Sequence, residues 1–282
     1  MATSTRFTDL VGCELPLQLA AMGGVGTTEL AAAVASAGGL GMVPNGTEPA
    51  EGPCGVNFLL PFDPSVDDVR AAAGRFRLVE FFYDDPRSDV VRAAHDGGAI
   101  AGWQVGSPAE AAAAEECGCD FVVAQGTEAG GHVRGTERLD ELLPAVIAAV
   151  DVPVVAAGGV ATAERFAELI AGGADAVRVG TRFVAAPESG AHPEYVRLLL
   201  EADGDDTELT EWFGEGWESA PHRVLRSSIE AAGHSGWRSP VPPYRGVEGE
   251  PGGMAMYAGT GVGEVRAAEP AAAVVADLVR LL

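Results

Sequence analysis

One imidazole in this sequence is placed where it could exchange a proton with a bound substrate. His132 lies in a loop that contains Gly126, Gly130 and Gly131 and that follows the short apolar run 121–124. An apolar run of this length is typical of a buried parallel strand, and the loop after such a strand can carry polar groups to a site. Because histidine titrates near neutral pH, we predict that His132 is a general base. The glycines would let the backbone approach a flat ligand closely.

The other four histidines are expected to have surface or capping roles. His95 lies at the end of an expected helix, where an imidazole can bond the last carbonyl groups. His192 lies at a helix start, and His222 and His234 lie in a region rich in tryptophan, glycine and proline. The sequence offers no Ser-His-Asp arrangement, His-Glu-x-x-His helix or carboxylate pair of comparable quality.

Carboxamides are few, and four of the five lie in or at the end of expected strands: Gln18, Asn57, Gln104 and Gln125. An amide can both donate and accept, which reading the pyrimidine edge of an isoalloxazine or of a base requires. We expect Gln104 and Gln125, at strand ends, to contact a ligand. Gln18 lies further inside its strand and could equally be a core amide with both ends bonded. Met22 and Gly23 would place a soft apolar wall and close backbone against one face of a ring.

Two glycine-containing loops follow the last two expected strands. Gly158-Gly159 ends one strand before a helix, and Gly180-Thr181 ends the next. In eight-stranded α/β barrels these loops commonly bind phosphate through backbone N–H groups at the N-terminus of a short helix. The chain contains no lysine, so backbone donors and the Thr181 hydroxyl would form the anion site. A tight turn without a ligand is the alternative for the glycine pair.

Composition excludes several classes of function. The formal net charge of −23 argues against nucleic-acid and anionic-membrane partners, which require a cationic surface. All 18 basic residues are arginines, so Schiff-base aldolases, pyridoxal-phosphate enzymes and P-loop nucleotidases are excluded. The four cysteines lack zinc-type spacing, and we predict no metal site. With no targeting segment and no apolar run of about 18 residues, we expect a soluble, cytoplasmic protein.

Eight short apolar segments, each expected to be a strand, alternate with mostly amphipathic helices. The strands are expected at 16–22, 40–43, 55–60, 77–83, 99–104, 120–125, 152–156 and 174–179. The helices are expected at 27–37, 65–73, 86–95, 108–116, 138–150, 162–171 and 193–202, the last as the eighth barrel helix. Residues 44–53 have no helical period. This alternation predicts the α/β class and a (β/α)8 TIM barrel, with a doubly wound open sheet as the alternative.

The end of the chain has a different composition from the barrel. We assign residues 1–202 to the barrel and residues 203–282 to an extension of the same domain. An acidic span at 203–211 leads into a region rich in tryptophan, glycine and proline at 212–253, which would lie as a lid over the barrel mouth. Residues 269–282 would form a closing amphipathic helix.

The segments that carry these features resemble the nitronate monooxygenase family, formerly called 2-nitropropane dioxygenases. The resemblance covers nearly the whole chain and rests on residues 19–25, 38–41, 55–58, 125–132, 156–159 and 180–183. The Glu-Ala-Gly-Gly-His motif at 128–132 is highly specific to the superfamily, which also contains the FMN-dependent enoyl-acyl-carrier-protein reductases. Three departures from the family pattern are Ala21 in place of a proline, the missing helix after the second strand, and Thr260 in place of a glutamine.

The resemblance implies a TIM barrel that binds FMN non-covalently. Twelve residues are expected at the site: His132 as the catalytic base, and as cofactor-binding residues Met22, Gly23, Asn57, Gln104, Gln125, Gly130, Gly131, Gly158, Gly159, Gly180 and Thr181. The substrates would be O2 and an alkyl nitronate or nitroalkane, for example propionate 3-nitronate, and the products a carbonyl compound and nitrite. Detoxification of nitroalkanes is the expected role, and a homodimer is one alternative for the oligomeric state.

Two other functions stay open from the sequence. One is an FMN-dependent NAD(P)H reductase of enoyl thioesters or quinones, which shares the motif at 128–132. The other is a flavin-binding or phosphate-ligand-binding protein without activity.

Overall fold

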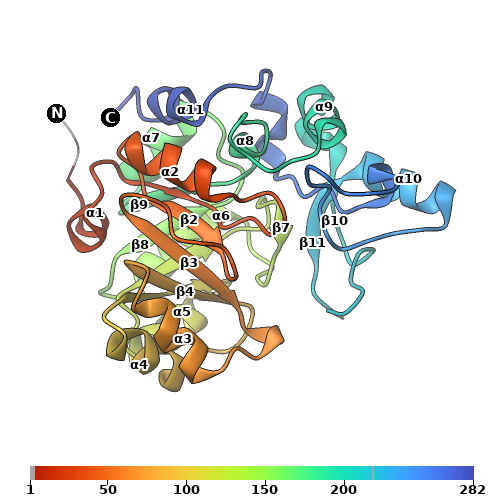
Figure 1. The fold of residues 1–282 in the computed structure, drawn as a ribbon. Coiled ribbons are helices and arrows are strands. Elements are labelled where there is room, and N and C mark those ends of the chain that lie inside the picture. Colours follow the sequence, from red (N-terminus) through yellow and green to blue (C-terminus); the bar gives the residue numbers. More distant parts are fainter. Residues whose placement is uncertain (1–3, 218) are drawn as a thin grey trace.

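The computed structural model describes residues 4–217 and 219–282, and its centre is a barrel of eight parallel strands. Each strand bonds its neighbour in the order β1-β9-β8-β6-β5-β4-β3-β2 (Figure 1). The strands are β1 (Leu17–Leu19), β2 (Gly41–Pro44), β3 (Cys54–Leu59), β4 (Leu78–Phe82), β5 (Ile100–Val105), β6 (Phe121–Gln125), β8 (Val154–Ala157) and β9 (Ala176–Val179). A parallel bridge between Gln18 and Leu40 joins β1 to the residue before β2 and closes the circle. The predicted TIM barrel is confirmed.

Helices α2 to α7 and α11 surround the barrel, whereas α10 lies to one side of it next to β10 and β11 (Figure 1). The helices are α1 (Arg6–Val11), α2 (Thr28–Ser36), α3 (Val66–Ala73), α4 (Ser88–Asp96), α5 (Pro108–Glu116), α6 (Leu139–Ile147), α7 (Ala163–Ala171), α8 (Thr181–Val184), α9 (Pro193–Glu201), α10 (Arg226–Ser235) and α11 (Ala271–Leu278). Residues 45–53, all described by the structure, form no helix between β2 and β3, as their composition predicted.

Local sequence explains where several helices begin. Side chains of Thr27, Ser65, Ser107 and Thr162 each accept a hydrogen bond from the backbone N–H three residues on, which satisfies a donor that the helix itself leaves free. Proline stands at the first position of α5 and α9, where its missing N–H costs nothing.

The eighth barrel helix is not the one that the sequence predicted. Helix α9 forms at the expected residues, but the helix that packs against both α2 and α7, and so closes the outer layer, is the C-terminal α11. Arg182, at the start of α8, holds α11 in place through Asp277 at 2.6 Å and Glu269 at 3.0 Å. Residues 1–202 therefore lack one outer helix of the barrel until the end of the chain supplies it.

The region between α9 and α11 contains a second, smaller sheet. Strands β10 (Thr207–Thr210) and β11 (His222–Leu225) are antiparallel, and β11 pairs in turn with β7 (Gly131–His132). Strand β7 belongs to the loop after barrel strand β6, so this sheet joins the C-terminal extension to the loop that carries His132 (Figure 1).

No helix within residues 4–217 and 219–282 is both long enough and apolar enough to span a lipid bilayer.

Candidate active site

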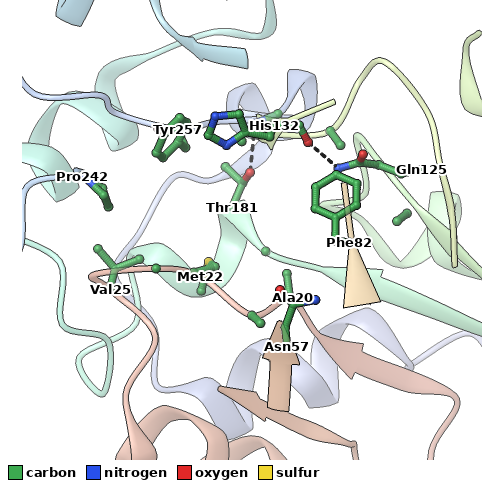
Figure 2. Close-up of a pocket in the computed structure, with 18 of the residues that line it drawn as sticks. Ala20, Met22, Val25, Asn57, Phe82, Gln125, His132, Thr181, Pro242 and Tyr257 are labelled. Carbon is green, nitrogen blue, oxygen red and sulfur yellow. Dashed lines mark hydrogen bonds between the residues drawn. The ribbon is translucent and has the colours of Figure 1, made fainter. Parts of the chain in front are cut away.

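A cavity of about 440 Å³ opens at the carboxyl ends of the barrel strands. All twelve residues that the sequence predicted for the site line this cavity. They meet there because parallel strands in a barrel all end at the same face, so loops that are distant in sequence become neighbours. Figure 2 shows His132 and Tyr257 along one side and Met22 and Asn57 along the other, with Thr181 between them.

Glycines allow two of the loops to approach other backbone segments. A Cβ at Gly130 would lie 2.6 Å from the backbone nitrogen of Gly259, so only glycine fits between these loops. Gly159 has a φ of 68° and would place a Cβ 3.0 Å from Thr260 Oγ1. At Gly23, by contrast, a Cβ would meet no protein atom within 4 Å, although the residue lines the cavity. The wall at Gly23 is therefore backbone with open space in front of it.

The predicted phosphate loops lie side by side at the end of β8 and β9. Gly180 is the N-cap of the short helix α8, and Thr181 is its first residue. The Thr181 hydroxyl accepts a hydrogen bond from the backbone N–H of Gly259 at 3.0 Å. A hydroxyl has one proton as well as its lone pairs, so Thr181 keeps a donor for an anionic ligand.

The first residue of the Glu-Ala-Gly-Gly-His motif has a structural function. Glu128 is buried, and its Oε2 accepts the backbone N–H of Leu139 at 3.0 Å, while Oε1 lies 3.1 Å from Arg138 Nη2. The residue that precedes α6 provides no side-chain cap. Glu128 caps this helix from a distance in sequence and thereby ties the His132 loop to the start of α6.

His132 is held in a neutral state by its surroundings. Its carbonyl oxygen accepts a hydrogen bond from Gln125 Nε2 at 3.0 Å, which fixes the loop against the end of β6 (Figure 2). Burial, together with the neighbouring His222, lowers the pKa of His132 to about 3. Nε2 of His132 is buried and has no hydrogen-bond partner within the described residues. The imidazole therefore has one buried ring nitrogen that is not hydrogen-bonded by the described residues.

His222 lies directly behind His132, and the prediction of a surface or capping role for it is wrong. It is fully buried, with its ring centroid 5.2 Å from that of His132. Its Nε2 accepts the backbone N–H of Phe213 at 3.1 Å, and Nδ1 therefore donates to the carbonyl of Ala220 at 2.9 Å. Both nitrogens are engaged, so His222 is a fixed neutral neighbour and not a second base. The pairing of β11 with β7 brings His222 next to His132. No pattern in the sequence around His222 indicated this position.

The remaining histidines lie away from the cavity. His192 caps α9 by accepting the N–H of Glu194 at 3.1 Å, as predicted. His234 is exposed. His95 was expected to cap the carbonyls of its own helix, but its Nε2 lies 2.8 Å from Asp120 Oδ2, because the carboxylate before β6 is within reach.

An ion pair inside the barrel forms part of the cavity wall and was not predicted from the sequence. Glu80 on β4 and Arg178 on β9 are both buried and in direct contact. Gln18, Gln104 and Asn57 each bond one or both of them. The sequence did contain a signal for this ion pair. Each of the two residues is the single charged residue of an otherwise apolar strand, and charged residues are almost never fully buried unless they are paired. Gln18 is thus a core amide with both ends satisfied.

Aromatic side chains cover the cavity mouth. Trp217 stacks on His132 with ring centroids 4.0 Å apart and an interplanar angle of 23°. Tyr83 and Phe62 pack edge-on against Trp217 at 4.6 and 5.5 Å. Tyr83 has a φ of 74°, a conformation that costs a non-glycine residue about 1–3 kcal/mol and occurs mostly at functional sites. Sequence spacing did not single out these three residues.

Two of the three departures from the family pattern lie at or beside the cavity. Thr260 does not line it; its backbone N–H bonds the carbonyl of Glu128 at 3.0 Å. Ala21 lines both the cavity and an adjoining hollow of about 410 Å³, which also contains Asn45 and Phe62. This hollow lies beside the loop that replaces the missing helix.

Comparison with known proteins assigns the chain to a family. Residues 50–280 match the family model described as nitronate monooxygenase. The chain belongs to the nitronate monooxygenase family. As a member of this family it is an oxidoreductase, and a binding protein without activity is set aside.

Relatives of this nitronate monooxygenase family member include enzymes with more than one activity. A nitronate monooxygenase of Pseudomonas aeruginosa is 31% identical, with 78% of this chain and 80% of that protein covered. A (3aS,4S,5R,7aS)-5-hydroxy-7a-methyl-1-oxo-octahydro-1H-indene-4-carboxyl-CoA dehydrogenase of Mycobacterium tuberculosis is 30% identical, with 85% and 71% covered. Among solved structures, FabK from Thermotoga maritima has a TM-score of 0.84 at 29% identity, with 99% and 96% covered.

Proposed function

We propose that this protein binds FMN non-covalently in the cavity and oxidises alkyl nitronates with O2, releasing a carbonyl compound and nitrite. The observation that carries the proposal is the state of His132, a buried neutral imidazole that lines the cavity and has a free Nε2. The family and the nitronate monooxygenase relative support this choice of reaction.

The residues of the cavity fit an isoalloxazine. Gln125 Oε1 is buried without a partner, which costs free energy unless a ligand donates to it. The open space in front of Gly23 would admit a flat ring against backbone. Asn57, Gln104 and Gln125 would bond the ring, and the phosphate would lie against the four residues of the two adjacent loops, Gly158, Gly159, Gly180 and Thr181. Bound FMN would supply the redox chemistry that links substrate oxidation to O2.

His132 would act on the substrate proton. A neutral imidazole can accept the α-proton of a nitroalkane at Nε2, and the nitronate anion that forms would stabilise the new imidazolium. With a substrate that is already a nitronate, the neutral imidazole would instead orient the anion by donating a hydrogen bond from its N–H. The aromatic cover formed by Trp217, Tyr83 and Phe62 would keep water from the reacting atoms.

The proposal is tested by measuring nitrite. Purified protein supplied with FMN should release nitrite from propionate 3-nitronate in air and none under argon. With a neutral nitroalkane as the substrate, His132→Asn should lower nitrite release by about 10²-fold or more, the usual contribution of a general base, while the visible spectrum of bound FMN persists. His234→Asn, a change at an exposed imidazole, should have no effect. A flavin-loaded protein that forms no nitrite from any alkyl nitronate or nitroalkane would contradict the proposal.

A reductase of enoyl thioesters or quinones is the second candidate function. It is favoured by the likeness to FabK over nearly the whole chain and by the CoA-thioester dehydrogenase relative. Against it, Arg134, two residues after His132, is already held by Glu110 and by Asp85 at 2.5 Å, and so is not free for a diphosphate group. Rapid anaerobic bleaching of bound FMN by NADH or NADPH, with reoxidation by an enoyl thioester or a quinone, would favour the reductase.

A further inference from the structure

The buried ion pair beneath the cavity determines which atoms of the neighbouring amides remain free. Arginine has only donors, and a carboxylate only acceptors, so an amide that touches one of them has a single possible orientation. Gln104 bonds Arg178 Nη1 at 2.5 Å, and the atom that it presents must be Oε1. Asn57 bonds Glu80 Oε1 at 2.9 Å, and the atom that it presents must be Nδ2.

Gln18 closes this network. Its Oε1 accepts from Arg178 Nε at 3.2 Å and Nη2 at 3.0 Å, and its Nε2 donates to Glu80 Oε2 at 3.2 Å. Each charged group thus receives amide partners from two sides, which offsets the cost of removing both charges from water. None of the partners can rotate without leaving a buried charge unsatisfied.

The atoms left over face the cavity as a defined pattern. Asn57 keeps Oδ1 and Gln104 keeps Nε2, neither of which has a partner within the described residues. Gln125 is oriented separately, because its Nε2 donates to the carbonyl of His132 and leaves Oε1 as an acceptor. The wall therefore presents one acceptor, Asn57 Oδ1, and one donor, Gln104 Nε2, while Gln125 Oε1 is a further acceptor that is buried. The pyrimidine edge of an isoalloxazine has an N–H flanked by two carbonyls, so the acceptor would match the N–H and the donor would match one of the carbonyls.

We propose that Glu80 and Arg178 are positioning residues for the flavin: their contact orients the Asn57 and Gln104 amides, and its balanced charge sets the reduction potential of the bound ring. This inference rests on the proposed binding of FMN in the cavity. The effect on the reduction potential follows from charge. Reduction adds electrons to the ring, so a net charge on the neighbouring residues would shift the equilibrium between oxidised and reduced FMN. As a pair, the two residues contribute no net charge.

The test compares FMN affinity and midpoint potential in single and double variants. Glu80→Gln leaves the cation alone and should raise the potential of bound FMN, whereas Arg178→Gln leaves the anion alone and should lower it. Each should also weaken FMN binding by about tenfold or more, the scale of one misoriented hydrogen bond. The double variant restores the charge balance but not the orientation, so its potential should return towards that of the wild type while its affinity stays low.

A matched control separates positioning from folding. Asp175 is another buried carboxylate in an arginine pair, bonded to Arg6 at 2.7 Å, and it does not line the cavity. Asp175→Asn should lower the melting temperature and leave FMN affinity and potential unchanged. Arg178→Lys provides a milder change: it keeps the charge and loses the planar fork, so the potential should stay near the wild-type value while affinity falls.

The outcomes are distinct. Potentials that do not move in opposite directions in the two single variants, or affinities that stay within about twofold of wild type, would show that the pair only supports the barrel. Wild-type protein that takes up no FMN would overturn the proposed function and this inference together.

Discussion

His132 and His222 lie side by side on paired strands with ring centroids 5.2 Å apart, yet only His132 has a ring nitrogen without a partner. The backbone groups of Phe213 and Ala220 occupy both nitrogens of His222. One imidazole is therefore available for proton transfer, and the other helps to keep it neutral.

Stability should fall in acid because His132 is buried as a neutral group. Its pKa is lowered from 6.5 to about 3, so the unfolded chain binds more protons than the folded one between these values. The stabilisation is complete above about pH 6.5 and is lost as the pH falls towards 3. Between pH 6.5 and pH 5 the loss should reach about 2 kcal/mol, at about 1.4 kcal/mol per pH unit. Urea unfolding of the protein without FMN at several pH values measures it.

His132→Asn is the control for this pH dependence, because the variant has no group that titrates at this position. Its stability should decline less than that of the wild type between pH 6.5 and pH 5. A residual slope is expected from His222, whose pKa burial also lowers. Equal slopes in variant and wild type would contradict the assignment of a buried neutral imidazole.

Trp217→Ala should return the pKa of His132 towards the ordinary value. Burial is the largest cause of the low pKa, and Trp217 provides the ring that stacks on the imidazole at 4.0 Å. Removing the indole would admit water and stabilise the charged form. NMR titration of the histidine ring protons measures the change. Trp237→Ala, which removes an exposed indole, should leave the pKa of His132 where it is.

Gly130→Ala should destabilise the protein and weaken the site. A Cβ there would lie 2.6 Å from Gly259 N and 2.7 Å from Ala258 C, both backbone atoms that cannot move independently of their loop. We expect a loss of about 1–3 kcal/mol in the free energy of unfolding, with weaker FMN binding because the His132 loop is displaced.

Gly233→Ala provides the matched comparison for Gly130→Ala. A Cβ at Gly233 meets nothing within 4 Å, and the residue lies inside α10. This change should be neutral or stabilise by up to about 1 kcal/mol through helix propensity. If both variants unfolded at the same urea concentration, the contact between the two loops would not matter for stability.

Glu128→Ala should destabilise α6 and the loop before it. The change would leave the buried N–H of Leu139 without an acceptor, and we expect a loss of about 1–3 kcal/mol, measured by urea unfolding. Glu128→Gln keeps an acceptor and should recover part of the loss. Glu141→Ala, on the first turn of the same helix but without this bond, is the control. A Glu128→Ala variant as stable as Glu141→Ala would contradict the capping function.

The residues of the strand-end loops can indicate a ligand site when the fold places all of these loops at one face of the barrel. Here the alternation of short apolar runs with helical segments was enough to predict the barrel, because period and glycine positions are local properties. Once eight parallel strands were expected, the strand-end residues Gln104, Gln125, Gly158 and Thr181 had to share one face. Sequence alone therefore predicted the barrel and twelve of the residues that line the cavity.

Only the tertiary structure decided which of these residues interact. Glu80 and Arg178 are 98 residues apart and meet through the closure of the barrel, and His222 reaches His132 through the register of β11 on β7. Helix α11 completes the outer layer from the far end of the chain. Such contacts depend on distances between segments that no local pattern encodes, since the free energy of a buried charge or imidazole depends on which groups the folded chain places around it.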